Sequence, residues 1–485
     1  MAQQNDWNLR CVTETPPSDA AAVHAVCVFT GDNPTSAALD GVTFPPLAAD
    51  ETALLHLAGP RRLLLLGCGT RAEFTYNTLR RAAGIAARQT QAARAGALCF
   101  SVPIVGDAAR AVQAAVEGVI EGSYTNDFYR AKDEDAAPPL RRLTLVVEAV
   151  TDEVNAAVTR GRVIAESVNW ARALVDEPGG SLPPQEFARR AATMAAEFGL
   201  TVETLDADAI RQRGMGGLHG IGQGSAHPPA LIVVRYEPPD AAQDDELWAF
   251  VGKGITFDTG GISIKPPLKM EVMKSDMAGG AAALGAVRAL AQLKPQRRIV
   301  AIVPTAENMP SATSIKPGDI VNTLAGYTLE VVDTDAEGRV VLVDALAYAV
   351  QLGAARIVDL ATLTGSIIVT LGTHRAGLFS NNDAWAAQVT QASERAGEPV
   401  WRMPVSDDYK KRIASDIADF KNYGGRPDAI AAALLLSKFV GETPWVHLDI
   451  AGTSWLDEPA PYAPAGATGA GVRTLIELIQ AEARV

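Results

Sequence analysis

Apolar segments alternate with helical segments along the second half of the chain, and this alternation constrains the fold more than any other feature. The apolar segments are short and rich in β-branched residues, as expected of buried strands. They read ALIVVRYEP, LWAFVGKG, RRIVAIVP, LEVVDTD, ARIVDLA and PWVHLDIAG. Helical segments such as Met277–Leu293 and Arg339–Gly353 lie between or after them. The alternation predicts a mainly parallel sheet with helices on both faces, and such sheets bind ligands beyond the carboxyl ends of their strands.

The N-terminal part of the chain shows the same two patterns less regularly. We expect Arg61–Gly69 to be a buried strand entering a turn, Leu79–Ala97 a helix and Leu143–Val150 another strand. Glu153–Val175 has helical periodicity without a breaking residue, so one long helix is expected there.

A chain of 485 residues exceeds the usual size of a single hydrophobic core, so more than one domain is expected. We place an N-terminal domain at residues 1–152. A linker helix and a larger C-terminal domain then occupy residues 153–485. The predicted fold class is α/β, with two domains that each contain a mixed or mainly parallel sheet flanked by helices.

Charge and composition narrow the class of protein. The formal net charge is −13, which argues against nucleic acid as the main partner, because phosphate binding depends on Lys and Arg. No apolar run approaches the ~20 residues of a membrane helix, and MAQQNDWNLR lacks the apolar core of a signal peptide. We therefore expect a cytoplasmic protein that does not enter membranes. In that compartment the cysteines are expected to be free, buried thiols: Cys11, Cys27, Cys68 and Cys99.

The segment DTDAEGR, Asp333 to Arg339, contains three carboxylates and an arginine. In an extended chain the alternate residues Asp333, Asp335 and Glu337 would lie on one side. Gly338 would then permit a sharp turn into a helix beginning near Arg339. Acids at a helix N-terminus can simply complement the helix dipole, but this does not explain three in alternation after a strand. An EF-hand loop is a sharper alternative, which we reject because LEVVDT is strand-like and an EF-hand needs flanking helices.

A second charged motif lies in GKGITFDTGGISIKP and in the MKSDM that follows it. The acids of the two motifs are Asp258, Asp276, Asp335 and Glu337. If these four carboxylates converge, they carry a charge of −4, which two divalent cations of the zinc, manganese or magnesium class would balance. Lys265 and Arg339 would remain as positive groups able to hold an oxyanion or a bound anion. Lys253 would fit beside two cations as a neutral nitrogen ligand.

At these residues the chain resembles the leucyl aminopeptidases, the cytosol aminopeptidase family of two-metal exopeptidases. The family signature GKG-x-x-x-D-x-GG-x-x-x-K with MK-x-DM is met by Lys253, Asp258, Lys265 and Asp276, and the signature NTDAEGR by Asp333–Arg339. DLATLTGS and WVHLDIAGTSW resemble further segments, so the similarity covers most of residues 170–485. The resemblance implies a catalytic C-terminal metallopeptidase domain. It also implies release of N-terminal amino acids, leucine-like ones preferred, from peptides with a free N-terminus.

The resemblance implies a role for each acid and for the first lysine. A tightly held metal ion, manganese or zinc, would be bound by Lys253, Asp258, Asp276 and Glu337. An exchangeable second ion would be bound by Asp258, Asp335 and Glu337, with the Asp335 carbonyl helping.

Further roles follow from the same resemblance. Lys265 would polarise the scissile carbonyl and stabilise its oxyanion, and Arg339 would hold a bicarbonate ion acting as general base. Met273 and Thr362 match positions that line the side-chain pocket. The substrate amine would bind one metal ion, and the family typically forms a homohexamer.

The sequence departs from the family pattern at several positions, including Thr259 in place of a common serine and Val340 in place of a common leucine. Asp333 stands where the family usually has asparagine, which adds a negative charge beside the metals. Arg426–Ile430, RPDAI, departs from the usual small residues ahead of the next helix, and no function follows from that change. None of the histidines pairs at HExxH spacing, and His447 is expected to be a hydrogen-bonded core residue.

Two other classes of function remain open. A non-catalytic member could serve binding or assembly, including DNA association, although all seven motif positions are intact. A two-metal hydrolase could instead act on phosphoesters or other amides. A comparison of a free with an N-acetylated peptide would separate the aminopeptidase from that hydrolase, because only the aminopeptidase needs a free amine.

Overall fold

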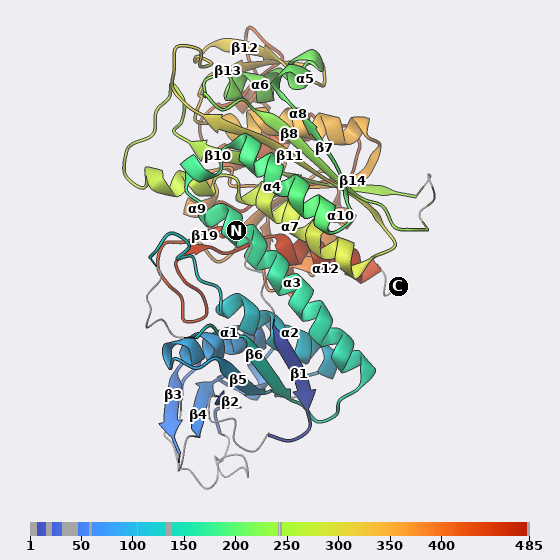
Figure 1. Ribbon diagram of the computed structural model, residues 1–485. Helices are drawn as coiled ribbons and strands as arrows, with labels where there is room; N and C mark the ends of the chain where they lie inside the picture. The colour runs from blue at the N-terminus through green and yellow to red at the C-terminus, as the bar shows by residue number, and fades with distance from the viewer. Residues whose placement is uncertain are drawn as a thin grey trace. The chain divides into compact units, whose positions relative to one another are not determined.

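The computed structural model describes residues 7–15, 22–31, 47–57, 61–103, 105–131, 138–240, 242 and 245–482. The chain divides into two compact units, seen in Figure 1. One unit contains Met1–Asn169 with Leu456–Gly466, and the other contains Trp170–Trp455 with Ala467–Val485. The two units divide within helix α3 (Asp152–Asp176). This helix confirms the long helix expected at Glu153–Val175. The domain boundary between residues 152 and 153 stays a prediction.

The first unit is built on a six-stranded sheet of order β1-β6-β5-β2-β4-β3. Neighbouring strands are parallel except for the antiparallel edge strand β3, so the sheet is mainly parallel as predicted. Its strands are β1 (Asn8–Val12), β2 (Ala22–Val28), β3 (Thr52–His56), β4 (Arg62–Gly67), β5 (Ala97–Ser101) and β6 (Arg142–Val146).

Helices α1 (Tyr76–Ala92) and α2 (Ala108–Gly122) of this unit pack closely on each other. A Cβ atom at Gly118 would lie 2.0 Å from the Arg80 carbonyl oxygen, so glycine is required where the two helices meet. The sequence predicted helix to Ala97. Helix α1 instead ends at Ala92, because Arg94 adopts a left-handed conformation with φ 55° and the chain turns into β5.

The second unit contains a nine-stranded mixed sheet of order β16-β15-β18-β14-β9-β11-β8-β7, with β10 also paired to β11. The central strands β18, β14, β9 and β11 are parallel, and the sheet becomes antiparallel on both sides of them. Its strands are β7 (Thr201–Leu205), β8 (Ala230–Tyr236), β9 (Leu247–Gly252), β10 (Gly254–Asp258), β11 (Arg298–Asn308), β14 (Ala354–Ala361), β15 (Ala376–Ser380), β16 (Val400–Arg402) and β18 (Trp445–Asp449).

Helices cover both faces of this sheet, as predicted for an α/β fold. On one face lie α4 (Pro184–Glu197), α7 (Ala278–Leu293), α10 (Asp383–Ala396) and α12 (Val472–Glu482). On the other face lie α6 (Gly216–Gly222), α8 (Glu337–Gln351) and α11 (Asp428–Ser437). Helices α7 and α8 contact the central strands and are buried almost all round, which explains why their sequences are apolar on every side.

The segment LEVVDTD does not join the main sheet. Strand β13 (Thr328–Val331) instead lies in a three-stranded sheet between β12 (Asp319–Asn322) and β17 (Phe420–Lys421). The prediction that LEVVDTD belongs to the same mainly parallel sheet as the other apolar segments was therefore wrong. The reason is a hairpin with β12, a pairing that the apolar pattern alone does not specify.

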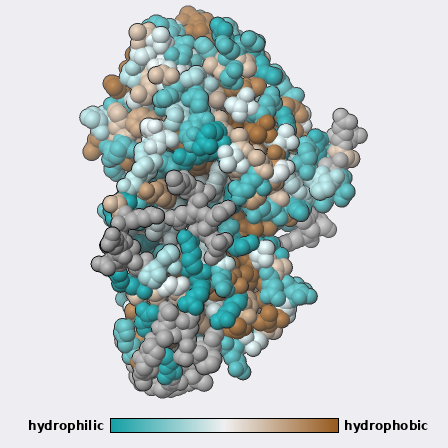
Figure 2. Space-filling view, viewed as in Figure 1, coloured by the Kyte–Doolittle hydropathy of each residue, from teal (hydrophilic) through white to brown (hydrophobic). Residues whose placement is uncertain are grey.

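The surface mixes polar and apolar residues, and the cysteines are not joined in disulfides. Hydrophobic and hydrophilic residues are interspersed on the face shown in Figure 2. Among the described residues, no helix combines the length and the apolar character that crossing a membrane requires. All four cysteines are free thiols, as predicted, but only Cys99 is buried, whereas the other three are half-buried.

Candidate metal centre

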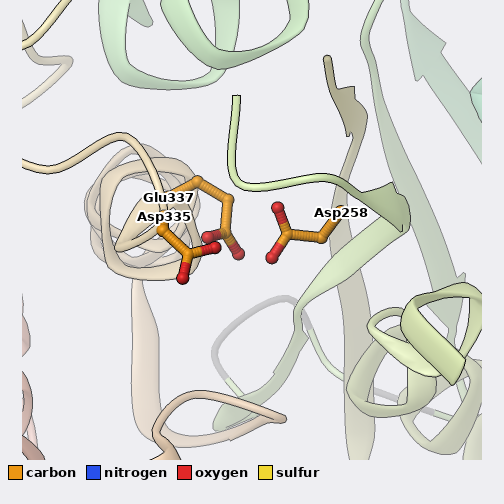
Figure 3. Close-up of side chains that lie close together, drawn as sticks. All are labelled: Asp258, Asp335 and Glu337. Carbon is orange, nitrogen blue, oxygen red and sulfur yellow. The ribbon is translucent and has the colours of Figure 1, made fainter. Parts of the chain in front are cut away.

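Three carboxylates from the two charged motifs meet at one point. Asp258 is the last residue of β10, whereas Asp335 and Glu337 lie at the turn that starts α8. Figure 3 shows their side chains pointing toward one another. One oxygen of each carboxylate lies within 4.8 Å of the others, which is the spacing of ligands around a shared cation.

The fourth predicted acid, Asp276, joins this group through Lys253. Asp276 follows the short helix η4 (Met270–Ser275), and Lys253 lies between β9 and β10. The Lys253 Nζ is 2.8 Å from Asp276 Oδ2 and 2.6 Å from Glu337 Oε1. Although burial opposes the charged form, the carboxylates of Asp276, Glu337 and Asp258 raise the pKa of Lys253. With these neighbours alone, the lysine is an ammonium that joins two acids.

Lys265 joins the remaining two acids in the same way. Its Nζ lies 2.8 Å from Asp258 Oδ2 and also forms an ion pair with Asp335. The four carboxylates and two lysines therefore sum to −4 + 2 = −2. The structure thus brings together all six of these predicted residues and leaves an excess of negative charge that cations can balance.

Three carboxylate oxygens of the cluster are buried without a hydrogen-bond donor among the described residues. Asp276 Oδ2, Asp335 Oδ1 and Glu337 Oε1 are buried and make no hydrogen bond of acceptable geometry, although each lies within ion-pair distance of a lysine nitrogen. A hydrogen bond depends on angle as well as on distance, so a nearby lysine nitrogen leaves these three oxygens without a hydrogen-bond donor in the described part of the chain. These oxygens remain available for a metal ion.

Burial and crowding shift the proton affinity of these acids. Burial raises the pKa of Asp258 to about 6, and the charge of Glu337 acts in the same direction. Burial likewise raises the pKa of Asp276, against the opposing charge of Lys253. Glu337 differs: burial opposes its charge, but Lys253 and Lys265 hold its pKa below the ordinary value. Added cations would favour the charged form of every carboxylate, as required of metal ligands.

Thr334 joins the two motifs through hydrogen bonds to the backbone. The Thr334 hydroxyl donates to the Gly260 carbonyl at 2.6 Å and accepts from the Ser263 amide at 2.8 Å. Gly260 and Gly261 have φ of +88° and +66°, so the tight turn requires glycine at both positions. The glycine-rich turn after Asp258 is therefore held against the loop that precedes α8.

Asn308 is a positioning residue that the sequence did not reveal. It is the register partner of Asp258 across β10 and β11. Its amide nitrogen donates to Asp258 Oδ1 at 2.8 Å and to the Thr334 carbonyl at 2.9 Å. The only sequence signal is its place at the end of an apolar strand, so its role becomes visible only once that strand is paired.

Asn422 is a second positioning residue that the sequence did not reveal, because its role also depends on how a strand pairs. Its carboxamide oxygen accepts from the Val332 amide at 2.8 Å, and its nitrogen donates to the carbonyls of Asp333 and Ala336 at 2.6 and 3.2 Å. Asn422 directly follows β17, whose pairing with β13 brings it beside the charged loop.

The acids of DTDAEGR do not alternate along an extended chain as predicted. The Asp335 amide donates to Asp333 Oδ1 at 2.9 Å, and this local bond closes a turn. Asp333 is not one of the three acids whose oxygens converge. Gly338 also differs from the expectation, because it lies within α8 rather than at a turn before it. A Cβ there would meet Lys253 Nζ at 2.8 Å, so the absent side chain makes room for the lysine.

Thr362 and Met273, the predicted pocket residues, lie beside Asp276. The Thr362 hydroxyl donates to Asp276 Oδ1 at 2.7 Å, and its carbonyl accepts from Lys253 Nζ at 3.0 Å. Met273 is half-buried on η4, and its carbonyl accepts from the Asp276 amide at 3.3 Å. These contacts place both residues at the edge of the charged cluster.

Arg339 lies in the first turn of α8, and only 2% of its side chain is exposed. Its Nη1 donates to Asp428 Oδ1 at 2.8 Å and to the Asn422 carbonyl at 3.0 Å. These two hydrogen bonds fix the guanidinium of Arg339, which lies two residues after Glu337 in the sequence.

Comparisons with known proteins agree with this geometry. The sequence model of the cytosol aminopeptidase family, catalytic domain, matches residues 169–476, and that of its N-terminal domain matches residues 48–133. A probable cytosol aminopeptidase of Solibacter usitatus is 47% identical over 434 residues, covering 89% of each chain. A probable cytosol aminopeptidase of Koribacter versatilis is 44% identical over 452 residues, covering 89% of this chain and 88% of the relative.

Two solved structures share the complete fold. The bottromycin maturation enzyme BotP in complex with Mn superposes with a TM-score of 0.86 at 36% identity, covering 96% of this chain and 99% of that one. A mutant of tomato leucine aminopeptidase superposes with a TM-score of 0.89 at 29% identity, covering 99% and 97%. On the strength of both domain matches and of relatives similar along most of its length, the chain belongs to the cytosol aminopeptidase family and is a metal-dependent aminopeptidase.

Proposed function

We propose that the second unit holds two divalent metal ions, manganese or zinc, within the charged cluster. The tightly held ion takes Lys253, Asp258, Asp276 and Glu337 as ligands. The exchangeable ion takes Asp258, Asp335 and Glu337, with the Asp335 carbonyl. The observation that carries this assignment is the approach of three carboxylate oxygens to within 4.8 Å of one another. BotP, a structural relative, is in complex with Mn.

Lys253 becomes a nitrogen ligand only if it loses its proton. Its carboxylate neighbours raise its pKa although burial opposes the charge, but two cations at the same carboxylates would act in the opposite direction. We therefore propose that Lys253 is a neutral amine when the metal ions are bound.

The remaining charged groups perform the chemistry around the ions. Bound divalent ions supply Lewis acidity at the scissile carbonyl. Lys265, whose side chain is 21% exposed, donates from Nζ to the oxyanion that forms on that carbonyl. Arg339 holds an anion beside the centre. The resemblance implies a bicarbonate ion acting as general base, whereas the anion found on Arg339 in the structure is the carboxylate of Asp428.

The substrates are peptides with a free N-terminus, whose amine binds one of the ions. We propose that Met273 and Thr362 border the pocket for the first side chain and that leucine-like residues are preferred. Their positions beside Asp276 support this placement. We further propose that the protein forms a homohexamer and works in the cytoplasm.

The test is hydrolysis of leucine amide and N-acetyl-leucine amide by chelator-stripped protein, with and without added manganese or zinc. Cleavage restored by metal, and only for the free amine, is the expected result. Cleavage of both substrates would contradict the need for a free N-terminus. Failure of every metal to restore cleavage in folded protein would contradict the two-metal assignment.

A further inference from the structure

The guanidinium of Arg339 has a negative partner within the chain itself. Its Nη1 donates to Asp428 Oδ1 at 2.8 Å, and the exposed fractions of the two side chains are 2% and 17%. A buried guanidinium needs a counter-charge, because an unpaired charge is costly in a medium of low polarity. Asp428 meets that need without any dissolved ion.

The position of Asp428 is set by helix packing. It is the first residue of α11, directly after Pro427, and α11 packs on α8, which carries Arg339. An acid in the first turn of a helix is also stabilised by the helix dipole. Asp428 belongs to RPDAI, the segment that departs from the family pattern and for which the sequence alone gave no function.

A carboxylate can replace bicarbonate as a partner of arginine. Both anions are planar, carry one negative charge and present two oxygens to a guanidinium. With Asp428 in place, bicarbonate at Arg339 would set two negative charges against one positive charge. The Arg339 Nε makes no hydrogen bond to the described residues, but a neutral acceptor such as water satisfies it without additional charge.

We propose that Asp428 is the built-in counter-anion of Arg339, a positioning residue that makes the aminopeptidase independent of bicarbonate. This inference rests on the proposed placement of Arg339 beside the metal centre. It assigns to one residue of this chain the place that the resemblance gives to a dissolved ion.

The test compares wild type with Asp428→Ala, Asp428→Asn and Asp428→Glu in carbon dioxide-free buffer, with and without added bicarbonate or formate. Asp383→Ala is the matched control, because Asp383 is also the first residue of a helix and pairs with an arginine, Arg402, away from the cluster. Two quantities are measured: kcat of the metal-loaded enzyme, and the midpoint of thermal unfolding of the metal-free protein.

Wild type and Asp383→Ala should show the same kcat and the same midpoint with and without either anion. Asp428→Ala should lose roughly 10- to 100-fold in kcat, the range of one hydrogen bond between charged groups. Bicarbonate or formate should restore several-fold of that loss and raise its unfolding midpoint in a concentration-dependent way. Asp428→Glu should keep the independence from added anion.

The proposal would be overturned if bicarbonate raised the kcat of wild type. It would also be overturned if neither anion changed the kcat or the thermal unfolding midpoint of Asp428→Ala. If Asp428→Ala does not fold, Asp428→Asn carries the test, because it keeps the shape and removes only the charge. The unfolding readout needs no catalysis. A failure of the proposed function, seen as no cleavage by loaded wild type, is therefore distinguishable from a failure of this inference.

Discussion

Two lysines with different exposure hold the four acids of the cluster. Lys253 is 3% exposed and lies between Asp276 and Glu337, whereas Lys265 is 21% exposed and lies between Asp258 and Asp335. Only the second can reach a substrate without a rearrangement of the core. The difference in exposure supports the proposal that Lys253 is a metal ligand and that Lys265 acts on the reacting carbonyl.

Replacement of Lys265 by alanine should spare the metals and slow the reaction. We expect kcat to fall by roughly 10²- to 10³-fold, the usual effect of removing one oxyanion donor. Metal content measured by mass spectrometry should stay at the wild-type level. Lys316→Ala, which removes an exposed lysine, is the control. Unchanged turnover in metal-loaded Lys265→Ala would refute the role.

Replacement of Gly338 by alanine should damage the site through Lys253. The new Cβ would lie 2.8 Å from the Lys253 Nζ and force the lysine away from Asp276 and Glu337. We expect weaker metal binding in isothermal titration and a native circular dichroism spectrum. Gly365→Ala is the matched control, because Gly365 begins α9 (Gly365–Leu371) and a Cβ there meets nothing within 4 Å. Equal metal affinity in both variants would argue against a spatial role for Gly338.

At the scale of elements, the site depends on pairings between segments far apart in the chain. Asn308 reaches Asp258 across 50 positions, through the register of β10 and β11. Asn422 reaches Asp333 across 89 positions, through β13 and β17. These contacts explain why the two charged loops keep their shape.

The sequence predicted the site residues that lie within the two motifs, but not those that are placed by these strand pairings. The ligands lie in two short motifs, and a local pattern is enough to find residues such as Asp258 and Glu337. Asn308 and Asn422 belong to no motif, because their roles arise from strand register. The small sheet around β13 escaped prediction because apolar strands of different sheets look alike. The turn at Asp333 escaped because a side-chain hydrogen bond competes with extended structure.

His447 ties β18 to β14, as expected of a hydrogen-bonded core residue. Its Nδ1 lies 2.6 Å from Asp359 Oδ1, and the two residues are register partners. Burial opposes the charged imidazole, but Asp359 raises the pKa of His447 above its ordinary value. The pair should therefore stabilise the fold fully below pH ~6.5, the unfolded value, and lose this contribution as the pH rises through the folded-state pKa.

His447→Gln tests that dependence, because glutamine does not titrate. We expect the variant to be less stable by about 3 kcal/mol below pH ~6.5, the cost of breaking a buried pair. The deficit should shrink at higher pH. Denaturant unfolding of both proteins between acid and alkaline pH measures the difference. A deficit that is constant with pH would show that the imidazole keeps one protonation state.

At the scale of the whole molecule, metal binding should stabilise the fold by mass action. With all four carboxylates and both lysines ionised, the cluster has a net charge of −2, so bound cations would relieve repulsion among its acids. An ion at 100 times its dissociation constant adds about 2.7 kcal/mol. Calorimetry with chelator and then with manganese should show the midpoint fall and recover.

Asp258→Ala is the partner experiment, because Asp258 is proposed to touch both ions. We expect this variant to bind neither ion. Added manganese should therefore leave its thermal unfolding midpoint unchanged. Two ions found in Asp258→Ala by metal analysis would overturn the bridging assignment. Asp383→Ala, which removes an acid far from the cluster in sequence and paired on the surface, should respond like wild type.

The hydrogen bonds that join the two charged loops have a consequence for how homologous proteins can evolve. Thr334, Asn308 and Asn422 hold the loops through backbone groups, and only one of their bonds, from Asn308 to Asp258, uses a ligand side chain. A descendant that lost Asp335 or Lys265 would forfeit its chemistry while keeping its architecture. The fold can therefore be retained after the catalytic activity is lost, and an inactive homologue of this protein could act as a binding protein.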